Sequence, residues 1–157
     1  MDESIRYEWV SDPATRSKIC SDILNELPDW FGNEVSLRDY VEKVYQLPVI
    51  AARDGDAYVG FLAVLEHTLY AAELCVMGVL EDYHRKGIGR MLVMMAEHYV
   101  RGMGKRFFTV KTLSSRDPYE PYQRTRSFYE SMGFLALEEF LTLWGEDDPC
   151  LMMIKQL

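Results

Sequence analysis

The stretch His84-Arg85-Lys86-Gly87-Ile88-Gly89-Arg90 decides how this sequence is interpreted. It follows an apolar run at residues 74–80 and leads into a segment at residues 91–100 in which apolar side chains recur at helical spacing. A helix start presents unpaired N–H groups and a partial positive charge, and glycine lets a ligand approach the backbone closely. With its flanking basic residues, this order of strand, glycine turn and helix predicts a binding site for a pyrophosphate.

Two well-known phosphate motifs do not fit the stretch. A P-loop needs the pattern Gly-x-x-x-x-Gly-Lys followed by Ser or Thr, which is absent. The dinucleotide fingerprint needs a third glycine, and residues 90–100 contain none. Taken alone, the stretch is also compatible with a tight loop that only begins a helix, so the rest of the chain has to decide between the two interpretations.

Length and composition set limits on the class of protein. With 157 residues, of which 48% are hydrophobic, the chain is expected to form a single domain over residues 1–157. Its polar start is unlike a signal peptide, and no apolar run is long enough to span a bilayer. Cys20, Cys75 and Cys150 are scattered, which indicates reduced thiols in the cytoplasm and no metal cluster. A net charge of −8 disfavours nucleic-acid binding, because phosphate contacts supply most of that affinity.

The spacing of apolar residues predicts an α+β fold with a mixed sheet. Strands are expected at residues 5–10, 48–53, 57–66, 69–80, 105–113, 134–143 and 150–156. Helices are expected at residues 13–27, 36–46 and 88–102, and in a segment that starts irregularly at 117–118 and ends near Met132. Asp54-Gly55 favours a hairpin turn. The side chains expected to face the core from the first two helices are Ile19, Ile23, Leu24, Leu27, Leu37, Tyr40, Val41 and Val44.

Two motifs in this order resemble the GNAT superfamily of N-acetyltransferases, which transfer acetyl groups from acetyl-CoA to amines. Residues 77–90, Met-Gly-Val-Leu-Glu-Asp-Tyr-His-Arg-Lys-Gly-Ile-Gly-Arg, resemble the cofactor signature Gln/Arg-x-x-Gly-x-Gly/Ala of that family. Residues 126–134, Arg-Ser-Phe-Tyr-Glu-Ser-Met-Gly-Phe, resemble its late helix and the strand that follows. His84 departs from the pattern, because it stands where the family usually has Gln or Arg.

The resemblance implies a fold and a set of cofactor contacts. The fold is a mixed, mostly antiparallel sheet flanked by helices, whose central strands splay apart at a bulge to take the pantetheine arm. Gly78 stands at the matching place, and its alternative interpretation is a small residue tolerated in a packed strand. A backbone N–H near Val79 matches the family's oxyanion donor. The residues implied in binding acetyl-CoA are Met77, Gly78, Val79, His84, Arg85, Lys86, Gly87, Ile88, Gly89 and Arg90.

Two side chains match catalytic positions of the family. Glu73 stands fourteen positions before Gly87, as does the glutamate base of the histone-type branch, and an apolar strand setting would suit a base. Its alternative is a solvated glutamate at a strand edge. Tyr129 matches the tyrosine that faces the CoA sulfur and acts as an acid toward the departing thiolate, and its alternative is a core aromatic. Tyr122 stands where the family often has an asparagine that contacts CoA.

The function implied by the resemblance is acetylation of a primary amine by direct attack in a ternary complex with acetyl-CoA, without a metal. The alternative is a catalytically silent module that binds or senses acyl-CoA and needs neither catalytic side chain. The acceptor is expected to be a small molecule or a peptide, with no nucleic acid and no membrane as partner, and a homodimer is left open.

The remaining aromatic and titratable residues give weaker indications. Trp30, Phe31 and Trp144 lie in breaks between the predicted elements, so they are equally suited to shape an acceptor pocket or to plug the core. His67 and His98 have no partners at metal-ligand spacing and are interpreted as ordinary solvated or packed histidines.

Overall fold

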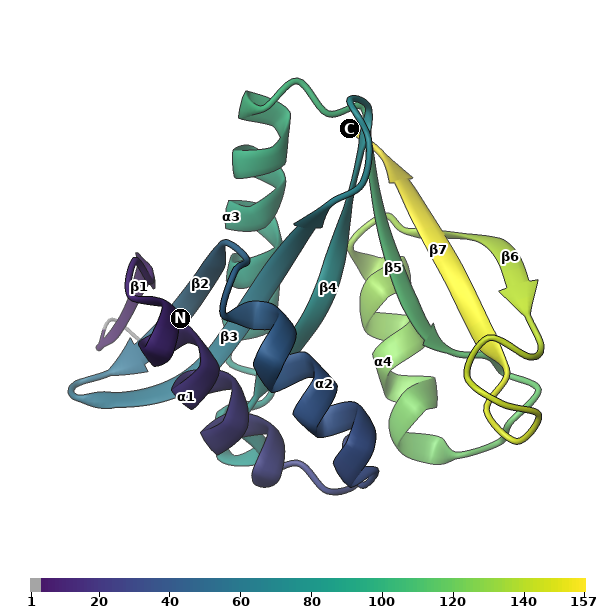
Figure 1. The fold of residues 1–157 in the computed structure, drawn as a ribbon, viewed down its shortest axis with the longest axis horizontal. Helices are drawn as coiled ribbons and strands as arrows, with labels where there is room; N and C mark the ends of the chain where they lie inside the picture. The colour runs from purple at the N-terminus through teal and green to yellow at the C-terminus, as the bar shows by residue number, and fades with distance from the viewer. Residues whose placement is uncertain (1–3) are drawn as a thin grey trace. The chain divides into compact units, whose positions relative to one another are not determined.

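A computed structural model describes residues 4–157, and it confirms the expected α+β fold with a mixed, mostly antiparallel sheet flanked by helices (Figure 1). The strands are hydrogen-bonded in the order β1-β2-β3-β4-β5-β7-β6. The elements in chain order are β1 (Ile5–Trp9), α1 (Pro13–Asn25), α2 (Glu34–Val44), β2 (Val49–Asp54), β3 (Ala57–Glu66), β4 (Ala71–Val79), η1 (Glu81–Tyr83), α3 (Ile88–Gly102), β5 (Phe107–Leu113), α4 (Glu120–Ser131), β6 (Leu135–Phe140) and β7 (Cys150–Gln156).

The chain divides into two compact units. The first comprises the described part of residues 1–65 together with residues 75–99, and the second comprises residues 66–74 and 100–157. Strand β4 therefore contributes its first residues to the second unit and its remainder to the first. None of the helices in residues 4–157 combines the length and apolar character needed to cross a membrane.

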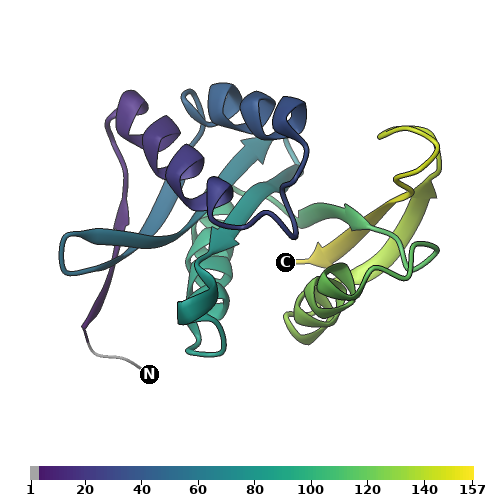
Figure 2. The same ribbon diagram turned by 90° about the horizontal axis from the view of Figure 1, so that it is seen from below.

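In the first unit, α1 and α2 cover one face of the strands, and α3 lies on the opposite face (Figure 2). The carboxylate of Asp12 caps α1 by accepting the Thr15 N–H at 3.0 Å, and Asn33 caps α2 in the same way. Both helices turn their apolar sides inward as expected. The buried residues of this core are Val10, Ile19, Cys20, Ile23, Leu24, Leu27, Val44, Val49, Ala51, Phe61, Ala63 and Val76, with Leu37, Tyr40 and Val41 packed against them.

Gly78 in β4 has a packing role that the sequence left as the alternative. A Cβ atom at this position would lie 3.1 Å from Leu27 and 3.2 Å from both Ile23 and Leu24, so α1 rests directly on the strand backbone. The register shifts recorded in the described strands lie elsewhere, at Ala52/Arg53 and between residues 136 and 138. A bulge at Gly78 therefore stays a prediction.

In the second unit, the register of the strands determines which side chains share a face. The start of β4 pairs with β5 in parallel, with Glu73 opposite Thr109, and β7 pairs with β5 in antiparallel fashion. Phe108 and Phe134 pack with ring centroids 5.8 Å apart on the α4 side. Because side chains alternate along a strand, Thr109 and Lys111 point to the other face of the sheet, which is the face of Glu73.

The structure differs from the sequence expectation mainly at the ends of elements. The last turn before α3 contains a short 3-10 helix, η1, that the residue pattern did not indicate. Strand β6 ends at Phe140 and not at Leu143, because the chain turns through residues 141–149 before β7 begins. The single domain expected over residues 1–157 stays a prediction.

Candidate functional site

The stretch at residues 84–90 forms the predicted turn and starts helix α3. The backbone takes left-handed conformations at Arg85, with φ of 63°, and at Gly87, with φ of 81°. The first helical hydrogen bond runs from the Met91 N–H to the Gly87 carbonyl at 3.0 Å, and Ile88 is buried and anchors the turn. Helix geometry leaves the N–H groups just after Gly87 without intrahelical acceptors. This turn can therefore offer backbone donors to an anion.

The surroundings of Gly87 fit a ligand that approaches the backbone. A Cβ atom built on Gly87 would meet no other atom within 4 Å, so the space beside its Cα is open. Arg85, Lys86 and Arg90 are exposed around it. The ammonium of Lys86 lies 5.1 Å from the centre of the Tyr83 ring. A pyrophosphate at this turn would meet both backbone donors and positive side chains.

The departure from the family pattern at His84 has a structural explanation. Its Nε2 lies 2.6 Å from the carbonyl oxygen of Val79, and a carbonyl can only accept, so Nε2 carries the proton. The imidazole and the Trp30 ring also pack edge-on, with their centroids 5.8 Å apart. His84 thereby ties the turn to the end of β4, where the Leu80 N–H donates to the Val59 carbonyl at 2.9 Å.

The strand residues implied in cofactor binding lie directly before this turn. Met77 and Val79 are half-buried and alternate with buried Gly78 along β4. The expected oxyanion donor near Val79 is a backbone group of this strand.

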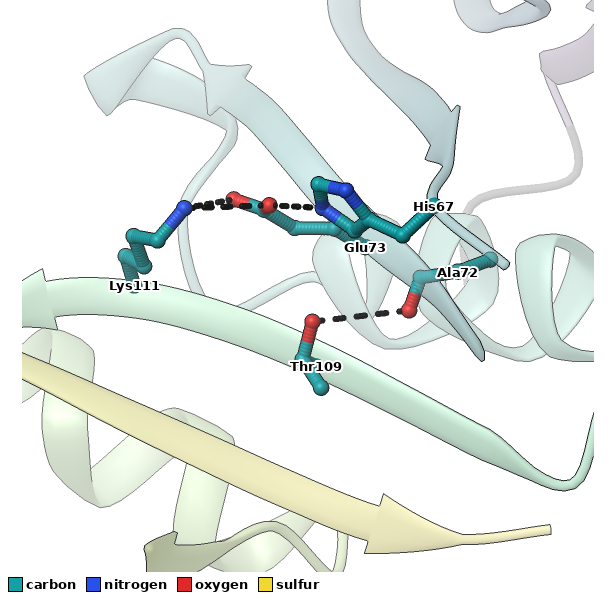
Figure 3. A network of polar contacts seen from close by, with 5 residues as sticks. All are labelled: His67, Ala72, Glu73, Thr109 and Lys111. Atoms are coloured by element: carbon teal, nitrogen blue, oxygen red, sulfur yellow. Dashed lines mark hydrogen bonds and ion pairs between the residues drawn. The ribbon is translucent and has the colours of Figure 1, made fainter. Parts of the chain in front are cut away.

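Glu73 is the centre of a charge network in the second unit (Figure 3). Its carboxylate lies between the Lys111 ammonium, at 3.2 Å from Oε1 and 3.5 Å from Oε2, and His67 Nε2, at 2.6 Å from Oε1. The side chain of Glu73 is 7% exposed, whereas that of His67 is 42% exposed. The interpretation of Glu73 as a solvated edge residue is therefore wrong. Its strand neighbours are apolar as expected, but two nitrogen donors share the carboxylate.

Two members of this network were missed in the sequence. His67 lies beyond the end of β3, where its backbone N–H donates to the Ala71 carbonyl at 3.1 Å and closes the turn into β4. Lys111 comes from β5, two residues after the partner of Glu73 in the parallel register. The only signal in the sequence was the even spacing of Thr109 and Lys111 on a strand whose register was unknown.

Cys150 is a further titratable group on this face of the sheet. Strand β7 places it opposite Leu113, and its side chain is fully buried. Burial raises the pKa of this thiol to about 11, with a lowering influence from Lys111 and a raising one from Glu73. The thiol therefore stays protonated at neutral pH, as expected for a core cysteine and not for a nucleophile.

Tyr129 lies on α4 and is 6% exposed. The centroid of its ring lies 5.6 Å from that of Phe128 and 5.8 Å from that of Phe134. The backbone carbonyl of Tyr129 accepts the Phe134 N–H at 3.0 Å. These contacts hold the ring rigidly, which suits both a core aromatic and an acid that must be positioned. Tyr122 lies near the start of the same helix, and burial is the main cause that raises its pKa to about 12.

The three aromatic residues proposed for the acceptor have different surroundings. Trp30 and Phe31 are partly buried against the core of the first unit, and Phe31 meets Tyr40 edge-on at 6.1 Å. Trp144, in the turn after β6, is 38% exposed. Within residues 4–157, no three His, Cys, Asp or Glu side chains gather in a way that could hold a metal ion.

Comparison with known proteins supplies an independent line of evidence. Residues 46–135 match the family model of the acetyltransferase (GNAT) domain. An uncharacterized N-acetyltransferase of Chlorobaculum tepidum is 32% identical over 140 residues, which are 88% of this chain and 79% of that protein.

Solved structures resemble the whole described fold. A protein assigned to the GNAT family from Desulfovibrio desulfuricans superimposes with a TM-score of 0.81 at 18% identity, covering 97% of this chain and 98% of that one. The PaiA N-acetyltransferase of Thermoplasma acidophilum, solved in complex with coenzyme A, gives a TM-score of 0.76 at 16% identity, covering 98% and 99%.

Proposed function

Because the chain belongs to the GNAT superfamily of acetyltransferases, we propose that it transfers the acetyl group of acetyl-CoA to a primary amine by direct attack in a ternary complex. The observation that carries this proposal is the turn at residues 84–90, with its open glycine, its helix start and its exposed basic side chains. Acetyl-CoA supplies the acetyl thioester and leaves as CoA.

The residues that would hold acetyl-CoA are those of the turn and the strand before it. The N–H groups that begin α3 after Gly87 would donate to the pyrophosphate, and the exposed side chains of Arg85, Lys86 and Arg90 would add positive charge. Met77, Gly78 and Val79 would follow the pantetheine arm. His84 would act indirectly, because its ring is already bonded to the Val79 carbonyl.

The chemistry needs a base, an oxyanion donor and an acid. The acceptor enters as an ammonium, so Glu73 would act as the base, by itself or through a hydrogen-bonded neighbour, and one proton would leave before the nitrogen attacks the thioester carbon. The Val79 N–H would donate to the oxygen that becomes negative as the C–N bond forms. The Tyr129 hydroxyl would protonate the sulfur as the C–S bond breaks.

The acceptor is proposed to be a small molecule or a peptide with a free amine, met by some of Trp30, Phe31 and Trp144. The negative net charge of −8 is compatible with a cationic acceptor. We also propose a cytoplasmic setting, which is supported by the three free cysteines.

Titration calorimetry with CoA and acetyl-CoA, followed by an acetylation screen, tests the proposed function. The parent protein is expected to bind both ligands and to unfold at a higher temperature with them, because a ligand of the native state stabilises it. The screen covers polyamines, amino acids, aminoglycosides and peptides. Absence of CoA binding would overturn the proposal, while binding without acetylation of any amine would favour the silent acyl-CoA module.

A further inference from the structure

The Glu73 carboxylate is poorly placed to exchange protons by itself. Its side chain is only 7% exposed, and both of its oxygens already accept from nitrogen donors. His67 shares one of these oxygens at 2.6 Å (Figure 3). Its side chain is 42% exposed, against 25% for that of Lys111, so it is the most exposed member of the network. A proton taken up by the network therefore has an accessible atom on His67 and little access to Glu73.

We propose that His67 is the residue that carries the proton for Glu73, and that Lys111 positions the pair. The inference rests on the proposed function and divides the role of the base between two residues. An ionised carboxylate can only accept, so neutral His67 donates its Nε2–H to Glu73 and keeps a free electron pair on Nδ1. The carboxylate behind the ring fixes this tautomer and stabilises the imidazolium that forms.

The proton balance of the step is simple. The N–H bond of the acceptor ammonium breaks, directly or through one water molecule, and an Nδ1–H bond forms on His67. The acceptor becomes a neutral amine with an electron pair for attack, and His67 becomes an imidazolium that faces the Glu73 carboxylate. The Nδ1 proton then passes to bulk water, which restores the neutral ring for the next cycle. Glu73 and His67 thus take up one proton as a pair.

Lys111 determines how the pair shares that proton. Its ammonium lies 3.2 Å from the same carboxylate oxygen that accepts from His67, so it places a positive charge directly beside the pair. Within residues 4–157 the Lys111 ammonium contacts the Glu73 carboxylate and not the imidazole, so it acts on His67 through the carboxylate. It is therefore a positioning residue.

The other titratable groups around the network do not replace His67. Cys150 faces the pair from β7, and its pKa of about 11 keeps the thiol neutral. The Lys105 ammonium donates to the Thr68 carbonyl at 2.7 Å and forms an ion pair with the Glu66 carboxylate at 3.3 Å. The proton is therefore assigned to Glu73 and His67.

The decisive variant is His67→Gln, in which the amide N–H can replace Nε2–H as donor to Glu73 but no nitrogen can take up a proton. With the best acceptor from the screen, kcat is expected to fall by about 10²-fold, in the range usual for general base catalysis, while CoA affinity stays unchanged. The acidic limb of the pH–rate profile should disappear. His98→Gln, on the exposed side of α3, is the matched control and should behave like the parent.

Lys111→Met tests the positioning role. Removing a positive charge makes proton uptake by the pair easier, so the acidic limb of the pH–rate profile should move to higher pH, and Lys111→Arg should restore it. A parental rate and profile in His67→Gln would overturn the role of His67. An unmoved limb in Lys111→Met would overturn that of Lys111.

Nitrogen NMR of the imidazole rings provides a test that needs no acceptor. The signals of His67, identified by their loss in His67→Gln, are compared at a pH where the ring is neutral, and they should show protonation on Nε2 and none on Nδ1. A neutral ring protonated on Nδ1 would overturn the proposal, even if the protein proves to be an acetyltransferase. Absence of any acetylation with the expected tautomer would instead count against the proposed function.

Discussion

The glycine turn and the Glu73 network are built in opposite ways. The turn is one contiguous stretch whose chemistry lies in the backbone, with left-handed conformations at Arg85 and Gly87 and a helix that starts at Ile88. The network consists of side chains from three segments, the turn after β3, β4 and β5, held together by strand register. A site of the first kind can be identified in a sequence, whereas one of the second kind depends on pairing between distant strands.

The largest effect is expected for Gly87→Asp in the turn. Aspartate would add a negative charge and a side chain to the open space beside the backbone, and it would also strain a φ of 81°. Calorimetry should show no measurable CoA binding. Gly104→Asp is the matched control, because Gly104 has a φ of 83° and equally open surroundings, so it carries similar strain. If Gly104→Asp also abolished binding, the effect would be one of folding and not of the turn.

Tyr129→Phe is expected to lower kcat by roughly 10²–10⁴-fold, the usual contribution of a general acid. The variant keeps the ring that packs between Phe128 and Phe134, so CoA affinity and melting temperature should change little. Steady-state kinetics and calorimetry on the same preparation separate the two quantities. Parental turnover would assign Tyr129 to the core aromatics.

Glu73→Gln is expected to lower kcat by about 10²-fold without loss of CoA affinity. Glutamine still accepts a hydrogen bond from His67 but does not stabilise an imidazolium by charge. The acidic limb of the pH–rate profile should therefore move to lower pH, because the ring then takes up its proton without an anionic partner. If rate and profile stayed parental, a water relay or another residue would be the base.

The same contrast explains how much the sequence could predict. Helix α3 and strand β3 were predicted with their observed bounds, because Gly87, the Asp54-Gly55 turn and the apolar spacing are local signals. The pairing of Glu73 with Lys111 could not be predicted, because it requires the parallel register of β4 and β5. The pairing with His67 depends on how the turn between β3 and β4 folds back onto the strand. The close approach of α1 to Gly78 is likewise set by packing between segments far apart in the chain.

Glycines in the first unit allow packing to be separated from turn formation. Gly78→Ala would place a methyl group 3.1–3.2 Å from the buried side chains of Ile23, Leu24 and Leu27. Overpacking of this kind typically costs about 1–3 kcal/mol of folding free energy. At Gly60 the nearest atoms to an added methyl group are 3.3–3.4 Å away, so Gly60→Ala should cost less. Urea unfolding of both variants measures the difference. Equal costs would show that helix packing does not explain Gly78.

The smallest effect is expected for His84, although it lies within the turn. Its ring bonds to the Val79 carbonyl at 2.6 Å and contacts the edge of Trp30, so its observed partners belong to the protein itself. His84→Ala should lower the free energy of unfolding by about 1 kcal/mol, the usual net worth of one hydrogen bond, with less than about a tenfold change in CoA affinity.

His84→Gln sharpens this test, because glutamine is usual for the family at this position and can also donate to a carbonyl. It should recover most of the stability lost in His84→Ala. Urea unfolding and calorimetry on the two variants give both quantities. A large loss of CoA affinity in His84→Ala, with unchanged stability, would mean that the ring turns toward the cofactor when it binds. The turn would then depend on side chains as much as the Glu73 network does.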